Sequence, residues 1–124
     1  MEKNYSKSLK IMSILMIVVG ITDIALGILS VLTAETATVV IWVTAAIALV
    51  AGIFEIVAGI KSINNDTSKA KSLIILGAVS VAFVVIANVV SMVGGGNLLV
   101  SAFIAGLIVP IFHVSEAVNL KKRA

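Results

Sequence analysis

The side chains of this chain that could do chemistry are few, and they lie inside long apolar segments. They are Asp23, Glu55, Ser80, Asn88, His113 and Glu116, which together form the predicted polar cluster. Counting 1.5 Å per residue from the nearest basic residues places Glu55, His113 and Ser80 at similar depth, roughly 9–12 Å, with Asp23 and Asn88 deeper. Burial and ion pairing shift the protonation of acids and imidazoles in opposite senses, so we expect the cluster to titrate between mildly acidic and neutral pH.

The same residues do not form a catalytic signature. The chain has no Cys, and its serines occur without a nucleophile elbow or a triad. The segment Gly94-Gly-Gly-Asn97 is not followed by the Lys of a phosphate-binding loop. Glu55, His113 and Glu116 are ligand types that suit zinc or iron, but three scattered residues are a weak signal for a metal site. We therefore predict a protein that is not an enzyme and that holds no metal or cofactor.

The segments around these groups predict transmembrane helices. Hydrophobic residues make up 60% of the chain, and the mean hydropathy is +1.23. Apolar runs at about 11–32, 39–60, 73–93 and 98–119 are each near the roughly 20 residues that a helix needs to cross a hydrocarbon core. The alternation typical of a membrane barrel is missing. The predicted fold is all-α, a four-helix bundle that forms a single transmembrane domain over residues 1–124 and contacts the lipid bilayer.

The basic residues predict the orientation of these helices. All nine Lys and Arg fall within residues 3–10, 61–71 and 121–123. The positive-inside rule therefore places both termini and the middle loop in the cytoplasm. The net charge of +3 is explained by groups that flank membrane spans and attract anionic headgroups, so no nucleic-acid partner is predicted. The first apolar run exceeds the roughly 7–15 residues of a signal peptide core, and we expect it to be retained.

The first two apolar runs repeat each other at an offset of 32. Segment 20–30 recurs at 52–62 with both glycines, the acid, three isoleucines and the serine in place. Residues i, i+3 and i+7 share a helix face, so Asp23 and Glu55 each lie on a face of small residues. A carboxyl group that faces lipid costs roughly 2.5–3.5 kcal/mol, which favours an inward position for both acids. The predicted helix-packing residues are Gly20, Gly27, Gly52 and Gly59.

A fainter repeat links the second and fourth runs, where Pro110-Ile-Phe-His113 matches Gly52-Ile-Phe-Glu55. The glycine-punctuated segments Gly20-Ile-Thr-Asp23-Ile and Ala51-Gly-Ile-Phe-Glu55-Ile-Val-Ala also resemble those of the HdeD-like acid-resistance membrane proteins of bacteria. That family typically has six spans, whereas four are predicted here. The resemblance implies a multi-pass protein of the bacterial inner membrane, linked to acid stress and without enzymatic activity. It supplies no functional residues to transfer.

Two functions are compatible with these patterns. The first is a small non-enzymatic membrane protein that assembles through its glycine-lined faces, with itself or as a subunit of a larger complex, and that responds to pH or stress. The alternative is a small proton- or ion-coupled transporter or channel that uses Asp23, Glu55 and His113 inside the membrane.

Overall fold

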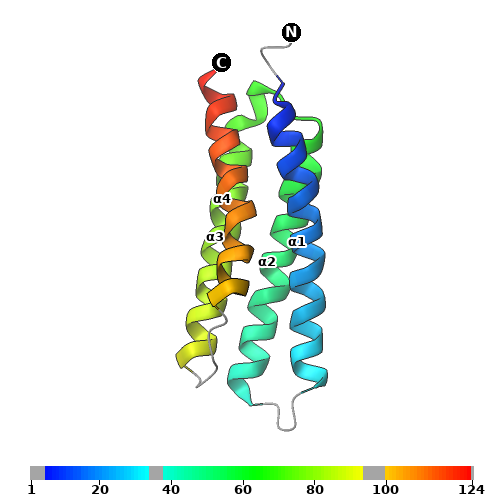
Figure 1. Ribbon diagram of the computed structural model, residues 1–124, viewed down its shortest axis with the longest axis vertical. Coiled ribbons are helices and arrows are strands. Elements are labelled where there is room, and N and C mark those ends of the chain that lie inside the picture. The colour runs from blue at the N-terminus through cyan, green and yellow to red at the C-terminus, as the bar shows by residue number, and fades with distance from the viewer. Residues whose placement is uncertain (1–4, 34–37, 94–99, 124) are drawn as a thin grey trace.

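The computed structural model describes residues 5–33, 38–93 and 100–123, and gives only the backbone of residues 91 and 100–105. Over these residues the chain is helical and contains no strand, so the prediction of an all-α chain is confirmed. Long helices lie side by side along one axis (Figure 1). They are α1 (Lys7–Leu32), α2 (Val39–Ile63), α3 (Ala70–Val93) and α4 (Val100–Lys122), with a short 3-10 turn, η1 (Thr67–Lys69), before α3.

Polar residues at the start of the helices explain where they begin. Ser6 caps α1 by accepting a hydrogen bond from the Leu9 N–H, and Thr38 caps α2 by accepting one from the Ile41 N–H. These bonds satisfy backbone donors that have no partner within the first turn of a helix. The apolar runs then continue each helix for more than six turns, which is the length that a bilayer requires.

Among the described residues, three helical segments are long and apolar enough to cross a membrane. They are Lys7–Leu32, Val39–Ile63 and Thr67–Val90. Large apolar side chains such as Leu26, Trp42, Ile75 and Phe112 are exposed on the outer surfaces of the four helices, as expected for contact with lipid. The length and apolar composition of these helices therefore fit a small membrane protein. Residues 98–99 of the fourth predicted span lie outside the described residues, and α4 follows them.

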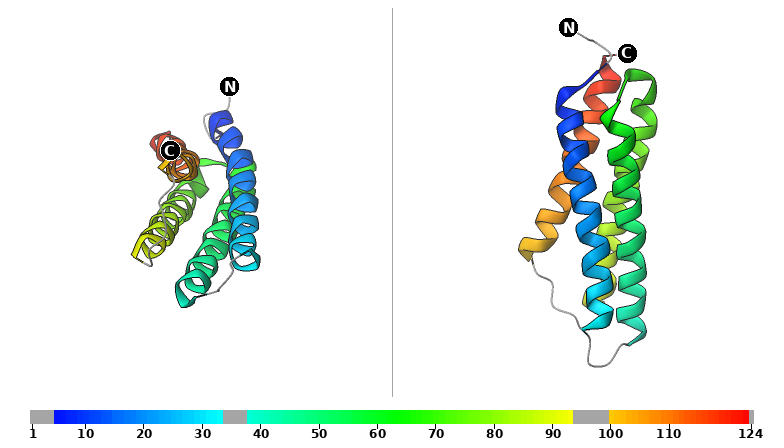
Figure 2. Two further views of the ribbon diagram at one scale, coloured as in Figure 1. Left: turned by 60° about the horizontal axis from the view of Figure 1, so that its bottom comes forward. Right: turned by 90° about the vertical axis from the view of Figure 1, so that its right-hand side faces the viewer.

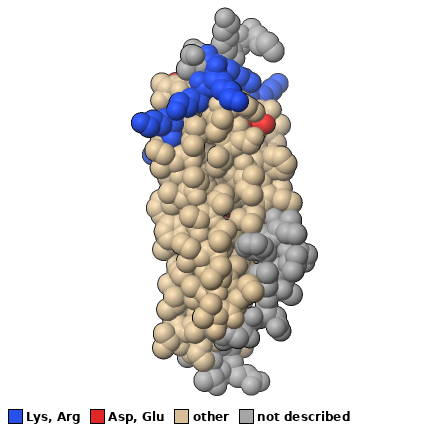
Figure 3. Space-filling model, turned by 90° about the vertical axis from the view of Figure 1, so that its left-hand side faces the viewer, with Lys and Arg blue, Asp and Glu red and all other residues tan. Residues whose placement is uncertain are grey.

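The helices contact one another in chain order, and α4 also contacts α1 (Figure 2). The basic side chains of the described residues gather at one end of the bundle, where α1 begins and α4 ends (Figure 3). We call this end the basic end. Its members are Lys7, Lys10, Lys61, Lys69, Lys71, Lys121, Lys122 and Arg123.

A hydrophobic core closes the bundle at the basic end. Leu9, Leu73 and Leu120 are fully buried there, together with Ala70 and Ala117, so α1, α3 and α4 are joined by apolar burial. Polar contacts tie the chain segments around this core, including the bond from the Arg123 guanidinium to the Tyr5 carbonyl oxygen at 2.8 Å. The basic end is thus the part of the bundle where three of the four helices share one apolar core.

The loop between α2 and α3 supplies a first testable prediction. The Ser68 hydroxyl and backbone N–H, both bonded to the carboxylate, hold the pKa of Asp66 below its ordinary value of 3.8, with a smaller contribution from the charge of Lys69. A carboxyl whose pKa is lower in the folded state stabilises the fold above its unfolded pKa, and this contribution is lost as pH falls through the folded pKa. Asp66→Asn keeps a residue that can cap the turn but cannot ionise.

We therefore expect the unfolding free energy of wild type to exceed that of Asp66→Asn at neutral pH and the two to converge below pH 3.8. Denaturant titration of wild type and Asp66→Asn in detergent, at neutral pH and again below pH 3.8, measures this difference in unfolding free energy. A difference that is independent of pH would show that the carboxylate charge contributes nothing to the cap.

Candidate functional site

The helices α1 and α2 approach each other closely where Gly20 meets Gly52. A Cβ atom on either glycine would lie 2.6 Å from the carbonyl oxygen of the other. Backbones touch at this crossing, and only glycine leaves room for that. Along the same contact, a Cβ on Gly59 would lie 2.6 Å from the Ser13 carbonyl oxygen, and one on Gly27 would lie 3.3 Å from that of Ala45. All four predicted packing glycines therefore pack α1 against α2 of the same chain.

Residues 32 positions apart occupy equivalent places in this contact. Gly20 meets the carbonyl of Gly52 and the side chain of Ile56, whereas Gly52 meets the carbonyl of Gly20 and the side chain of Ile24. The Gly27 and Gly59 contacts are related by the same offset, because Ala45 follows Ser13 by 32 positions. The four glycines and the carbonyl oxygens nearest to them in this contact are thus related by the offset of 32.

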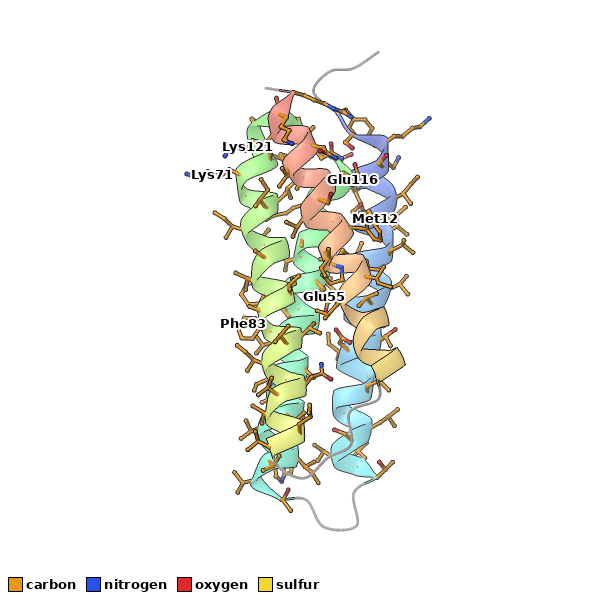
Figure 4. All side chains as sticks on the ribbon, turned by 60° about the vertical axis from the view of Figure 1, so that its left-hand side comes forward. Met12, Glu55, Lys71, Phe83, Glu116 and Lys121 are labelled. Atoms are coloured by element: carbon orange, nitrogen blue, oxygen red, sulfur yellow. The ribbon has the colours of Figure 1, made fainter. Side chains whose placement is uncertain are left out.

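Two acids converge on this crossing. Side chains of a helix tilt toward its N-terminus, so Asp23 leans toward Gly20 on α1 and Glu55 leans toward Gly52 on the antiparallel α2. The contact of Gly20 with Gly52 and this tilt bring the two carboxyl groups near each other. Glu55 is fully buried, and Asp23 is partly buried. Glu55 lies midway along the bundle with its side chain between the helices (Figure 4). We call Asp23 and Glu55 the acid pair.

The acid pair is poorly satisfied by its surroundings. Both carboxyl oxygens of Glu55 and the Oδ2 atom of Asp23 are buried without a hydrogen-bond partner among the described residues. An isolated carboxylate is costly to bury, and two ionised carboxylates side by side would repel strongly in a medium of low dielectric constant. Such a pair costs less to bury when at least one of its members is protonated. The chemistry open to this site is therefore the uptake and release of a proton.

The ring of Phe54 helps to fix the rotation of α2 at this level. It stacks on Phe83 of α3 with a distance of 5.5 Å between ring centroids. Phe54 directly precedes Glu55, so the stacked rings hold one face of α2 against α3 while the next residue points toward α1. This aromatic contact gives Glu55 a fixed direction toward Asp23.

His113 forms a second buried polar site, on α4. The side chain is fully buried, and its Nε2 atom lies 2.6 Å from the Ser62 Oγ atom of α2. The same hydroxyl donates to the Ala58 carbonyl oxygen at 2.6 Å. On its other side the ring faces Gly77 of α3, where a Cβ atom would lie 2.9 Å from the His113 Nδ1 atom. His113 Nδ1 is buried and has no hydrogen-bond partner among the described residues.

No hydrogen bond between described residues joins the other members of the predicted polar cluster to these two sites. The Ser80 hydroxyl donates to the Leu76 carbonyl oxygen at 2.9 Å, and the Asn88 Nδ2 atom donates to the Val84 carbonyl oxygen at 2.7 Å, both within α3. Glu116 is partly buried on α4, nearer the basic end than Glu55 (Figure 4). Among the described residues, the side chain that hydrogen-bonds to His113 is that of Ser62, and neither Glu55 nor Glu116 bonds to it.

The sites are separated along the bundle axis. Glu55 and Ser62 lie seven residues apart on α2, which corresponds to about 10 Å at 1.5 Å per residue. In the part of the chain that the structure describes, no group of three or more His, Asp or Glu residues is arranged to hold a metal ion. The metal site that the sequence allowed from Glu55, His113 and Glu116 is not assembled there.

Ser62 and Gly77 belong to the second site, and the predicted polar cluster does not include them. One signal in the sequence could have pointed to Ser62: it follows Glu55 by seven residues, and so shares the face of α2 that carries the acid. Gly77 is an isolated glycine in an apolar run, where only the contact with His113 reveals its role. Serines and glycines are common in packed membrane helices, so neither residue is marked as part of a histidine site before the fold is known.

The sequence matches no protein-family model, and no curated protein or solved structure is significantly similar to it. The two buried polar sites are therefore the basis on which a function can be assigned.

Proposed function

We propose that this chain is a small non-enzymatic, multi-pass membrane protein that responds to pH through the acid pair. The observation that supports this function is the position of the pair: two carboxyl groups lie at the point where α1 and α2 touch, and both oxygens of Glu55 are buried without a partner among the described residues. Ionisable groups in such places inside a membrane are costly, and are usually kept for proton or ion chemistry.

Protonation at this position acts directly on helix packing. While at least one of the two carboxyl groups carries a proton, they do not repel each other as two charges and α1 stays against α2. Loss of that proton places two negative charges at the Gly20–Gly52 crossing, where the nearest carbonyl oxygens add further negative potential. Repulsion then favours separation of the two helices or entry of water. A change in proton concentration is thereby converted into a change in the contact between α1 and α2.

The orientation and setting of the protein follow from its charge. We propose that the basic end faces the cytoplasm, because eight basic side chains of the described residues gather there. A place in the bacterial inner membrane and a role under acid stress, as the resemblance to the HdeD-like proteins implies, agree with a proton-binding pair inside the bilayer.

Self-assembly requires surfaces other than the glycine faces. Gly20, Gly27, Gly52 and Gly59 are already occupied by the contact between α1 and α2. We propose that any assembly with a second copy or with a larger membrane complex uses the outer faces of the bundle and leaves this contact intact.

Proton-coupled transport is the second candidate function. It is favoured by the Ser62–His113 site, which adds a buried polar group nearer the basic end than the acid pair. A pH-dependent proton flux into liposomes that contain the purified protein, abolished by Glu55→Gln, would identify transport. A response of the acid pair to pH without flux would identify the first function.

Infrared spectroscopy of the protein in lipid tests the proposal, because a protonated carboxyl group has a separate C=O band. We expect wild type to show such a band from a buried acid, with an intensity that depends on pH. Glu55→Gln should remove it and Asp23→Asn should shift it, because the two groups share their environment. Glu116→Gln is the matched control on α4 and should leave the band unchanged. Absence of the band at every pH, or its survival in Glu55→Gln, would refute the proposed function.

A further inference from the structure

We propose that His113 is a second proton-binding site, that Ser62 fixes its proton-accepting atom as Nδ1, and that protons move between the basic end and the acid pair through this atom. The inference rests on the proposed function, since it requires that the acid pair binds protons.

The hydrogen bonds of Ser62 determine the tautomer of His113. A serine hydroxyl has one hydrogen to donate. The Ala58 carbonyl oxygen can only accept, so the Ser62 hydrogen points to it across 2.6 Å. The contact of 2.6 Å between Ser62 Oγ and His113 Nε2 is then a hydrogen bond only when Nε2 carries the hydrogen and Oγ accepts it. The neutral imidazole is therefore protonated on Nε2, and its lone pair lies on Nδ1.

The surroundings of His113 Nδ1 leave this lone pair free to accept a proton. The atom faces Gly77, where any side chain would cover it. The described residues that contact the imidazole from α2 and α3 are Ser62 and Gly77, and neither carries a charge. The nearest ionisable residue on α4 is Glu116, one turn closer to the basic end. A proton on Nδ1 thus meets no competing ion pair.

The position of His113 makes it an intermediate stop. Ser62 is about two helical turns nearer the basic end than Glu55 on the same face of α2. Ser80, one turn beyond Gly77 on α3, is fully buried and offers a hydroxyl oxygen on the side away from the basic end. Buried polar groups therefore continue from Ser62 and His113 toward the acid pair, and water can cross the remaining distance to Glu55.

The proposed transfer conserves protons at each step. One proton arrives at Nδ1 and converts the imidazole to imidazolium, while the Nε2–H bond to Ser62 stays in place. One proton then leaves from the same Nδ1 atom and joins the acid pair, and the neutral Nε2–H tautomer returns. The ring does not need to turn over between the two steps. Ser62 acts as a positioning residue, because it holds the ring through Nε2 and leaves Nδ1 as the atom that exchanges.

The chain has a single histidine, so nitrogen-15 NMR of histidine-labelled protein reports on this site without assignment. We expect the wild-type spectrum to show Nε2 protonated and Nδ1 unprotonated in the neutral state, with Nδ1 taking up the proton as pH falls. A neutral imidazole that is protonated on Nδ1 would overturn the inference. This measurement uses wild-type protein alone and so does not depend on the folding of any variant.

Two serine variants supply a matched comparison. Ser62→Ala should lose the preference for the Nε2–H tautomer, whereas Ser80→Ala removes an equally buried hydroxyl that bonds to its own helix and should keep it. Loss of the preference in both variants, or in neither, would show that Ser62 does not position the ring.

The rate of proton uptake tests the route. After a pH jump, the infrared band of the acid pair should appear at least about tenfold more slowly in His113→Leu and in Ser62→Ala than in wild type, with the same final pH dependence. Equal rates in wild type and in whichever of these variants folds would refute the route but leave the proposed function standing. If the band does not depend on pH in wild type, the proposed function itself fails.

Discussion

Gly52→Ala is expected to lower the unfolding free energy by about 1–3 kcal/mol, as overpacking of a close contact does. The new Cβ atom would lie 2.6 Å from the Gly20 carbonyl oxygen and 2.6 Å from the Ile24 Cγ1 atom. A side chain can turn away from such a contact, but a backbone carbonyl cannot, so α1 and α2 must move apart. The shift also separates Asp23 from Glu55. Unfolding of the purified protein in mixed micelles by denaturing detergent, followed by circular dichroism, measures the effect.

Gly106→Ala is the matched control for this substitution. Among the described residues, the atom near a Cβ at that position is Val84 Cγ1, at 3.9 Å, which is an ordinary contact. Alanine is also preferred to glycine in a helix by about 1 kcal/mol. We therefore expect Gly106→Ala to be neutral or stabilising. Equal stability of Gly52→Ala and Gly106→Ala would show that α1 and α2 do not touch at the crossing.

Gly20→Ala should resemble Gly52→Ala, because each glycine meets the carbonyl of the other. In the double variant, which combines Gly20→Ala with Gly52→Ala, the second alanine enters a contact that the first alanine has already opened. Its cost should therefore be clearly smaller than the sum of the two.

Much of this architecture could be predicted from the sequence because a bilayer imposes simple rules. Long apolar runs must become helices, since no other conformation of a single segment satisfies its own backbone in lipid. The glycine faces could be recognised as packing surfaces because the spacing of Gly20 and Gly27 is helical and recurs at Gly52 and Gly59. The sequence did not reveal that these surfaces pack against each other within one chain, because a glycine face fits another copy equally well.

The arrangement of the polar residues was harder to predict. Depth counted along straight helices placed Glu55 level with His113, but that count ignores the tilt of side chains toward the helix N-terminus. This tilt brings Asp23 and Glu55 together from different depths. Ser80 and Asn88 were expected to serve a shared cluster, whereas both donate to carbonyl oxygens of their own helix. Serine and asparagine side chains in a helix can bond either to a carbonyl oxygen of their own helix or to a group on another helix. Tertiary packing decides which of these bonds forms.

Asn65→Ala is expected to be among the most destabilising substitutions at the basic end, at about 3 kcal/mol for the loss of three hydrogen bonds. The Asn65 Oδ1 atom accepts from the Ser6 N–H at 2.8 Å. Its Nδ2 atom donates to the Ser6 carbonyl oxygen at 3.0 Å and to the Ser62 carbonyl oxygen at 2.8 Å. Asn65 is 3% exposed, so water cannot fully replace these partners. Unfolding titrations of this variant and wild type measure the difference.

Asn64→Ala provides the control, because the side chain of Asn64 is exposed and only its backbone carbonyl accepts a described bond. Equal effects at positions 64 and 65 would mean that the contact with Ser6 contributes nothing to stability. A larger effect at Asn65 should extend to function, because this side chain holds the carbonyl of Ser62, the residue that positions His113. The nitrogen-15 spectrum of Asn65→Ala should then show a mixture of His113 tautomers, whereas that of Asn64→Ala should match wild type.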